Sequence, residues 1–453
     1  MPIAVGHTAL PEDRGAFRAP VAGPRVPRAG SVPRTDYCVV FLLVVISGNP
    51  VVPRIFFSTE VVVLCVASFL ACRMLSLRRL RFSRESAAVF ILFSSLLLTQ
   101  TVLLGTFHWV TMGGFLSRLF IGFAAVQLVP RFPQVFCRVM VLLALIALFF
   151  WLFQVSGLVA LAEGPIRALP WNRGGGTRQS VLVHTFIRRA GSFSQRNSGM
   201  FWEPGAFAGY LNLALLLLTL IRDSFPVGLH KRYRLILFAA CLSTMSTGGY
   251  MVLPFIFLFH NLGRKRQIIT PQCAVAIVVV VVGSYFAWYR LNFVGQKTLV
   301  QYESAMVQSK HNWHLGRLGT AVFDWEYIRR RPFTGWGLHS ETRWALNPNF
   351  EELGLAAMGN GLSDFTAKFG LIGLGCFVAM LWLGFCRLPG ASKPVAALAT
   401  GIILLQLNGE CFLNYPLFLG LMFLAGAPGS QPRVIPSQMR SEREGKHEQN
   451  HGR

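Results

Sequence analysis

The sequence predicts an all-α, polytopic membrane protein of about 12 transmembrane helices, with both termini in the cytoplasm and two long loops on the far side of the membrane. Three observations predict this class: an apolar composition, a series of apolar segments, and basic residues gathered in alternate links. Of the 453 residues, 53% are hydrophobic and only 14% are charged, and the mean hydropathy is +0.49. A soluble domain does not reach this hydrophobicity, so we expect the chain to sit in lipid.

The apolar segments divide the chain into a transmembrane domain and two tails. We expect the transmembrane domain at 37–427, a cytoplasmic tail rich in Pro, Gly and Arg at 1–36, and a polar cytoplasmic tail at 428–453. Both tails are expected to be disordered. A span needs about 20 apolar residues. The expected spans lie at roughly 37–53, 56–72, 86–105, 110–129, 134–160, 204–221, 233–247, 249–262, 270–290, 365–386, 394–408 and 411–427.

Lysine and arginine are concentrated in every second link between these segments. Short cytoplasmic loops carry this excess, so the even links and both termini are placed in the cytoplasm. The basic residues of these links are Arg73, Arg78, Arg79, Arg81, Arg84, Arg131, Arg138, Arg222, Lys231, Arg232, Arg234, Arg264, Lys265, Arg266, Arg387 and Lys393. The net charge of +24 is therefore explained by topology and by contact with anionic lipid, and no nucleic-acid partner is expected.

The nine cysteines all fall inside or beside apolar stretches. They form no CxxC pair and no Cys/His spacing of the kind that binds a metal. We therefore expect no disulfide framework and no cysteine-based metal site, and no other pattern in the sequence indicates a cofactor.

Two external links are long, at about 161–203 and about 291–364, and function is expected there. The first holds six arginines, no lysine and two glutamates, a net charge of +4. Long loops cross a membrane regardless of charge, so one interpretation is a solvated basic face. The other is an anion site, because guanidinium groups bind phosphate oxygens in a bidentate fork. A pyrophosphate carried on a lipid would fit such a site.

The stretch 196–212 leads from Arg196 through Glu203 and Pro204 into an apolar helix. Pro204 suits a first helical turn and Glu203 suits the positive end of that helix, so capping alone would explain the glutamate. The stretch also resembles a motif of the O-antigen polymerase and ligase family, the Wzy-like membrane glycosyltransferases. In that motif an arginine, a glycine and a Glu-Pro or Asn-Pro pair precede a helix.

The second long loop resembles the same family in two further motifs. The segment 316–337 begins with Gly-Arg, where the arginine is Arg317, and continues with helix-like periodicity to Ile328. It ends in Arg-Pro-Phe-Thr-Gly-Trp-Gly, whose Arg331-Pro332 pair indicates a turn. The segment 359–373 is similar to a signature in which His-Asn precedes a helix. Gly359 stands here in place of that histidine, although the loop also holds His311, His314 and His339. The resemblance covers roughly 185–420.

The resemblance implies metal-independent glycosyl transfer at the periplasmic face of a bacterial inner membrane, from an undecaprenyl-pyrophosphate-linked glycan to a sugar hydroxyl. The loop arginines would neutralise the departing pyrophosphate, where charge develops in the transition state. Glu203 or His339 would accept the proton of the attacking hydroxyl. The residues implied for catalysis are Glu203, His339 and Arg317, and those implied for substrate binding are Arg188, Arg189, Arg196, Arg317, Asn360 and Asp364.

Polymerase and ligase differ in their acceptor, which is another lipid-linked repeat unit in one case and lipid A-core in the other. The Trp-Glu-Pro-Gly sequence at 202–205 and the missing His-Asn pair favour a polymerase of an exopolysaccharide or capsule-like glycan. A transporter or lipid-linked glycan flippase is the alternative from another class. Carriers usually keep external loops short and show inverted repeats, and this sequence shows neither. Expected partners are membrane lipid, a flippase and a chain-length regulator.

Three sets of polar residues lie in or near the expected spans. Arg118 sits within a span, where an unpaired charge would cost about 2.5–3.5 kcal/mol, so it should face the protein interior. Asp364 and Lys368 are four residues apart and can pair on one helix face. Asn408 and Glu410 follow the eleventh span and either line a cavity or form a polar turn.

Overall fold

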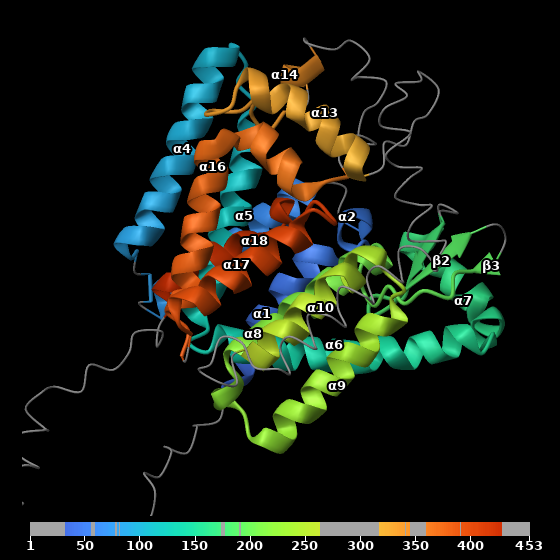
Figure 1. Ribbon diagram of the computed structural model, residues 1–453. Coiled ribbons are helices and arrows are strands. Elements are labelled where there is room, and N and C mark those ends of the chain that lie inside the picture. The colour runs from blue at the N-terminus through green and yellow to red at the C-terminus, as the bar shows by residue number, and fades with distance from the viewer. Residues whose placement is uncertain are drawn as a thin grey trace, which may run out of the picture. The chain divides into compact units, whose positions relative to one another are not determined.

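The computed structural model describes residues 32–55, 59–77, 79–80, 82–173, 177–189, 192–262, 317–339, 341–344, 359–389 and 391–427 (Figure 1). From Arg34 onward the described residues belong to one compact unit. The first part contains α1 (Arg34–Gly48), α2 (Val52–Ile55), α3 (Thr59–Ser76), α4 (Arg84–Leu104), α5 (Trp109–Leu128), α6 (Phe132–Val155), η1 (Leu158–Ala162), α7 (Glu163–Ala168) and η2 (Pro170–Asn172).

The remaining elements include a small sheet and a second series of helices. They are β1 (Arg178–Ser180), β2 (Thr185–Arg189), β3 (Ser192–Phe193), α8 (Pro204–Leu220), η3 (Arg222–Ser224), α9 (Val227–Ser243), α10 (Thr247–Leu262), α13 (Arg317–Arg330), α14 (Glu341–Trp344), α16 (Gly361–Cys386), α17 (Lys393–Leu407), η5 (Phe412–Asn414), α18 (Pro416–Gly420) and η6 (Leu421–Gly426).

The helical prediction is confirmed wherever the structure can be compared with it. Each expected span within the described residues has helical structure, while the one at 270–290 lies outside them. Five helices, α3, α4, α5, α6 and α16, are long and apolar enough to cross a membrane. Several other apolar helices are shorter. The chain is therefore a mostly helical, multi-pass membrane protein, and the count of 12 spans and the sidedness stay predictions.

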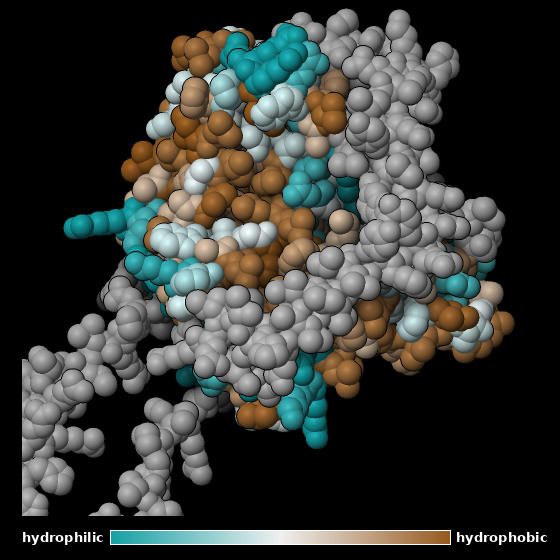
Figure 2. Space-filling view, in the orientation of Figure 1, coloured by the Kyte–Doolittle hydropathy of each residue, from teal (hydrophilic) through white to brown (hydrophobic). Residues whose placement is uncertain are grey.

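The helices pack in two groups, which are joined by α1 and by the packing of α17 on α10 and α8 (Figure 1). In one group α5 packs on α3 and α18, and α16 packs on α17 and η6. In the other, α8 packs on α6, α9 and α10, and all of its residues except Thr219 are buried. A helix that is apolar all round belongs in a protein core. Figure 2 shows apolar residues gathered over α4, α16 and α17, with hydrophilic residues beyond them near α13 and α14.

The first long loop contains a small antiparallel sheet in the order β1-β2-β3, which was not predicted. Arg178 of β1 lies opposite Ile187, and Arg188 of β2 lies opposite Phe193 of β3. The sheet is attached to α6 because Phe186 packs against Phe150. The sheet therefore holds two arginines of the loop at defined positions.

Helix α16 is broken at Gly370, where φ is 65° and ψ is −174°. The turn that ends the motif at 331–337 fills this break. Its backbone bonds, donor first, are Leu371 to Pro332 (2.6 Å), Ile372 to Phe333 (3.4 Å), Trp336 to Ala367 (2.9 Å) and Gly337 to Lys368 (3.0 Å). Gln100 of α4 donates to the carbonyls of Thr334 (2.5 Å) and Lys368 (2.8 Å). A helix break within a membrane protein needs such partners for the freed backbone groups.

Replacing Gly370 by alanine should destabilise the protein. Its φ is one that residues with a side chain rarely adopt, and an added Cβ would collide with the Phe333 carbonyl. We expect a loss of at least roughly 1–3 kcal/mol, seen as a lower thermal unfolding midpoint in detergent. Gly375 of the same helix has open space around it, so Gly375→Ala is the matched control. Equal midpoints for the two variants would contradict the account of the break.

Candidate functional site

A cavity of about 300 Å³ opens where the sheet meets the first turns of α8, α10 and α13. Four arginines line it: Arg178 from β1, Arg188 from β2, Arg196 from the segment before α8, and Arg317 from the first turn of α13. Among the described residues that line this cavity, Glu203 is the one carboxylate. The cavity therefore carries a strong positive charge, and we refer to it as the arginine cavity.

Arg317 joins two carboxylates at the edge of the arginine cavity. Its Nη2 donates a close hydrogen bond to Glu410 Oε1 and lies 3.5 Å from Glu203 Oε1. Arg317 and Glu410 are 93 residues apart in the sequence. The Glu410 side chain is 13% exposed and the Glu203 side chain 31%, so the glutamate outside the cavity lining is the more deeply buried.

The pKa values of the two carboxyl groups are displaced in opposite directions. Burial raises the pKa of Glu410 well above its ordinary value, and its hydrogen bond with Glu203 acts in the same direction. Burial also opposes ionisation of Glu203, but its pKa is lowered because the hydrogen bond from Glu410 and the nearby arginine charges outweigh burial. Glu410 is therefore the weaker acid of the pair and Glu203 the stronger. Two titratable groups with pKa values driven apart are typical of acid–base sites.

Glycines let the backbone approach this group of charges. A Cβ on Gly205 would lie 2.8 Å from Glu410 Oε1 and 3.2 Å from Arg317 Nη2. A Cβ on Gly359 would lie 3.6 Å from the Cα of Arg317, and one on Gly361 would collide with the backbone of Glu410. The Gly-Asn-Gly sequence at 359–361 therefore packs directly against both partners of the ion pair.

Glu203 occupies the N-cap position of α8, but its side chain makes no capping hydrogen bond. Pro204 begins the helix, as predicted. The capping interpretation thus leaves the side chain unexplained, whereas its contacts with Arg317 and Glu410 account for it.

The other arginines of the first loop have different surroundings. Arg188 pairs closely with Glu163 and its guanidinium lies 5.5 Å from the centre of the Phe193 ring. Arg196 Nε donates to the Thr244 carbonyl at 3.2 Å, which ties this residue to the end of α9. The side chain of Arg189 lies outside the described residues, as do His311 and His314.

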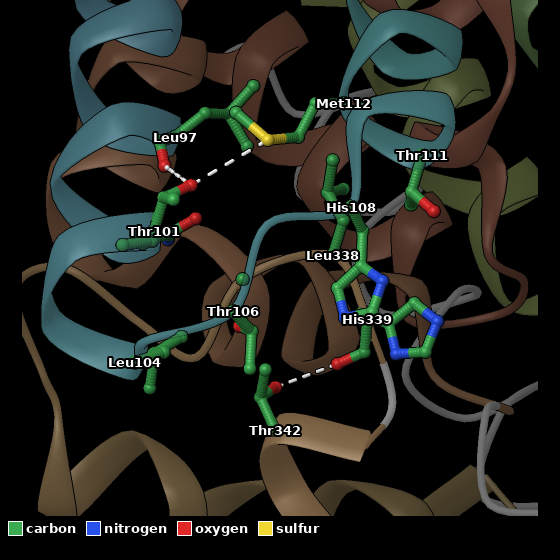
Figure 3. A pocket seen from close by; sticks show the side chains of 12 residues that line it. Leu97, Thr101, Leu104, Thr106, His108, Thr111, Met112, Leu338, His339 and Thr342 are labelled. Carbon is green, nitrogen blue, oxygen red and sulfur yellow. Dashed lines mark hydrogen bonds between the residues drawn. The ribbon is translucent and has the colours of Figure 1, made fainter.

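His339 does not line the arginine cavity. It stands beside a separate cavity of about 30 Å³ between the end of α4 and the segment before α14 (Figure 3). Its ring stacks on that of His108, with the centroids 3.8 Å apart. The two candidates for the catalytic base, Glu203 and His339, therefore lie in different cavities.

Asn360 and Asp364 have contacts within the protein. Asn360 Oδ1 accepts from the backbone N–H groups of Leu362 and Ser363, both at 3.1 Å, and so caps α16. Its amide also donates to Asn408 Oδ1 at 3.3 Å. Asp364 accepts a hydrogen bond of 2.6 Å from Lys368, which confirms the expected pair. Direct contact of Asn360 or Asp364 with a substrate stays a prediction.

Asp364 belongs to a buried ion network that connects three helices. Arg343 of α14 lies 3.6 Å from Asp324 Oδ1 and 3.7 Å from Asp364 Oδ1, and its side chain is 1% exposed. Burial, together with the charge of Asp364, raises the pKa of Asp324 to about 7. The network holds α13, and with it Arg317 at the start of that helix, against α16.

Replacing Arg343 by methionine should destabilise this network, because two buried carboxylates would lose their shared cation. Breaking a buried ion pair costs roughly 3–5 kcal/mol. The matched control is Arg329→Met, since the exposed Arg329 pairs with Glu326 at 3.6 Å and such pairs contribute about 0–1 kcal/mol. The thermal unfolding midpoint in detergent should be lower for Arg343→Met and unchanged for Arg329→Met. Similar midpoints would contradict the assigned role of the network.

Sequence reasoning did not assign Arg178 or Glu410 to the site. Arg178 was counted in the charge of the loop, and only the register of β1 and β2 brings it beside Arg188 and Glu203. The sequence leaves two interpretations of Glu410 open, a position in the cavity or in a polar turn, and its contact with Arg317 puts it at the edge of the arginine cavity. An acidic residue after a span, facing a loop with excess arginine, was the signal that could have indicated it.

Arg118 is paired inside the helix bundle. Its Nη2 lies 2.6 Å from Glu60 Oε1 of α3, and the two side chains are 21% and 35% exposed. Glu60 therefore supplies the partner that a charge within an expected span needs.

The comparisons with known proteins concern the second half of this site. Residues 234–378 match the family model described as O-Antigen ligase, and this segment contains Arg317, His339, Asn360 and Asp364. None of the curated proteins matches the chain. The match includes the motifs at 316–337 and 359–373, whereas the motif at 196–212 lies outside it, and it supports a membrane glycosyltransferase-type activity on lipid-linked glycans. The match covers about a third of the chain, and over this segment the chain is similar to the O-antigen polymerase and ligase family.

Proposed function

We propose that the protein polymerises undecaprenyl-pyrophosphate-linked oligosaccharide repeat units into an exported polysaccharide, by metal-independent glycosyl transfer at the periplasmic face of the inner membrane. The arginine cavity, with the Glu203 carboxylate in its wall, carries this proposal. The helix ends that meet there are those of α8, α10, α16 and α17. Under the predicted topology, all four ends face the periplasm.

Four guanidinium groups facing one cavity suit a pyrophosphate. Each stays charged at physiological pH and can present two parallel N–H donors to phosphate oxygens. When the bond between the anomeric carbon and the pyrophosphate breaks, negative charge grows on the leaving oxygen. Fixed cations that face this charge stabilise the transition state more than the ground state. Arg178, Arg188, Arg196 and Arg317 are the residues proposed to do so.

Glu203 is the proposed general base. The acceptor hydroxyl attacks the anomeric carbon, its proton passes to the Glu203 carboxylate, and the bond to the pyrophosphate breaks. A base has to lie within hydrogen-bond reach of the hydroxyl, and Glu203 lines the arginine cavity whereas His339 does not. Glu410, as the weaker acid, donates its hydrogen bond to Glu203 and keeps that carboxylate oriented and ionised.

The two glutamates should respond differently to the same substitution. Glu203→Gln removes the base and should lower polymer formation by roughly 10²–10⁴-fold. Glu410→Gln replaces a neutral acid by a neutral amide that still donates a hydrogen bond, so activity should stay within about tenfold of the unmodified protein. Polymer is measured on gels of membrane extracts, normalised to the amount of inserted protein. If Glu410→Gln abolished polymer formation while Glu203→Gln retained it, the assignment of Glu203 as the general base would be overturned.

Polymerase and ligase give different intermediates when the gene is deleted. A polymerase deletion should leave single repeat units on the lipid carrier, because no second unit is joined to the first. A ligase deletion should leave full-length polymer on the carrier. Mass spectrometry of the extracted carrier lipids distinguishes the two, and we expect single units. Stranded polymer would replace the polymerase proposal by transfer to lipid A-core.

The break in α16 is the observation that bears on a transporter or flippase. Transporters use broken helices whose free ends line a substrate site. Here the backbone of the turn at 332–337 occupies the break through the hydrogen bonds described above. The break therefore serves to attach the long loop, and the family match agrees with an enzyme.

A further inference from the structure

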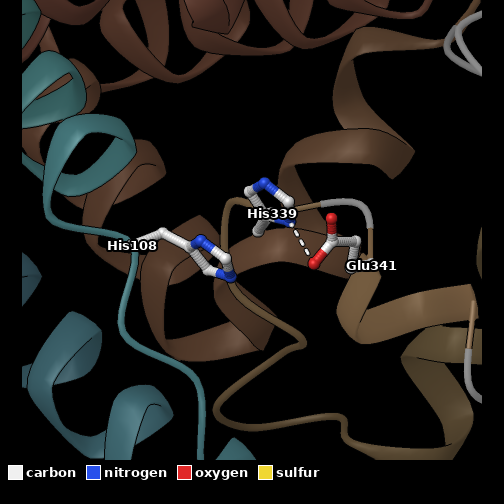
Figure 4. A group of neighbouring side chains, drawn as sticks. All are labelled: His108, His339 and Glu341. Atoms are coloured by element: carbon white, nitrogen blue, oxygen red, sulfur yellow. Dashed lines mark ion pairs between the residues drawn. The ribbon is translucent and has the colours of Figure 1, made fainter.

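Two histidines and a glutamate outside the arginine cavity form a cluster, shown in Figure 4. His108 lies in the short link between α4 and α5, His339 follows the turn that fills the break in α16, and Glu341 begins α14. One ligand atom from each of the three lies within 4.8 Å of the others. Residues from two distant parts of the chain thus bring nitrogen and oxygen ligands to one point.

The contacts of His339 within the described residues leave its ring open to a ligand. The buried Nδ1 atom has no hydrogen-bond partner among these residues, although Glu341 Oε2 lies 3.6 Å away. Buried polar atoms are nearly always hydrogen-bonded, so an exception calls for an explanation. An imidazole nitrogen without a hydrogen-bond partner among these residues is available to a metal ion.

We propose that His108, His339 and Glu341 form a binding site for a divalent transition metal ion of the Zn²⁺ class. Two imidazoles and one carboxylate are a common ligand set for such ions, with water completing the coordination. The rings now lie face to face, with an interplanar angle of 8°, so one ring has to turn for both to reach one ion. Glu341 is exposed, both histidines are half-buried, and the adjoining cavity of about 30 Å³ holds about one water molecule.

A metal at this point would fasten the long loop to the α4–α5 link. Thr342 Oγ1 already donates to the carbonyls of Trp336 (2.6 Å) and His339 (2.7 Å), and the next residue is Arg343 of the buried ion network. An ion bound here would therefore hold the segment that carries Arg343. This role is structural and separate from the proposed glycosyl transfer, so either proposal can fail without the other.

The test uses the full-length protein, purified in detergent with a tag that contains no histidine. After treatment with a chelator, Zn²⁺ is added and bound metal is measured by calorimetry and by elemental analysis. We expect micromolar or tighter binding and a rise of a few degrees in the unfolding midpoint, because a ligand that binds the folded state stabilises it. His108→Ala, His339→Ala and Glu341→Gln should each lose one bound ion and that rise.

Two matched controls separate this cluster from other metal-binding groups. His314→Ala changes another histidine of the same long loop, and Glu326→Gln changes an exposed glutamate of α13. Both should bind as much Zn²⁺ as the unmodified protein. The proposal is overturned if Zn²⁺ binds with a dissociation constant about 100-fold weaker than micromolar, a loss of about 2.7 kcal/mol, or does not bind at all. Stoichiometry that is unchanged in His108→Ala and His339→Ala would overturn it as well.

Discussion

One guanidinium between two carboxylates is the contact on which the site depends. Arg317 meets Glu410 and Glu203, and these side chains come from three separate elements at the same end of the bundle. Two carboxyl groups this close cannot both ionise beside one cation at low cost. Burial raises the pKa of Glu410, while the hydrogen bond from Glu410 and the arginine charges lower that of Glu203. The contact thus sets the ionisation of Glu203, the proposed base in the lining of the arginine cavity.

The position of Arg317 in turn depends on backbone that is not helical. The turn at 332–337 occupies the break at Gly370, and the network around Arg343 holds α13 against α16. Neither the turn nor the ion network lines the arginine cavity, but both fix the position of the first turn of α13. A site on long loops needs this kind of support, because a displacement of about 1 Å in a catalytic group can cost about 100-fold in rate.

The sequence predicted what depends on local composition. Apolar runs predicted the helices, and residue chemistry selected Arg317, Arg196 and Glu203, which the fold brings to one cavity. Local composition could not predict contacts across long sequence separations. Glu410 meets Arg317 because α13 and α17 both pack on α16. Arg178 enters the cavity through the register of a three-residue strand. His339 is a similar case. Its residue type made it a candidate base, but the fold places it at a different cavity.

We propose that glycan is transferred from its lipid pyrophosphate at the arginine cavity. The most direct measurement is an assay of the purified protein with its lipid-linked repeat unit, followed by electrophoresis of the products. We expect a ladder of polymer with the unmodified protein and with Arg329→Ala, whose side chain is exposed on α13. With Arg196→Ala we expect no ladder, because a cation of the cavity is lost. A normal ladder from folded Arg196→Ala protein would contradict the account.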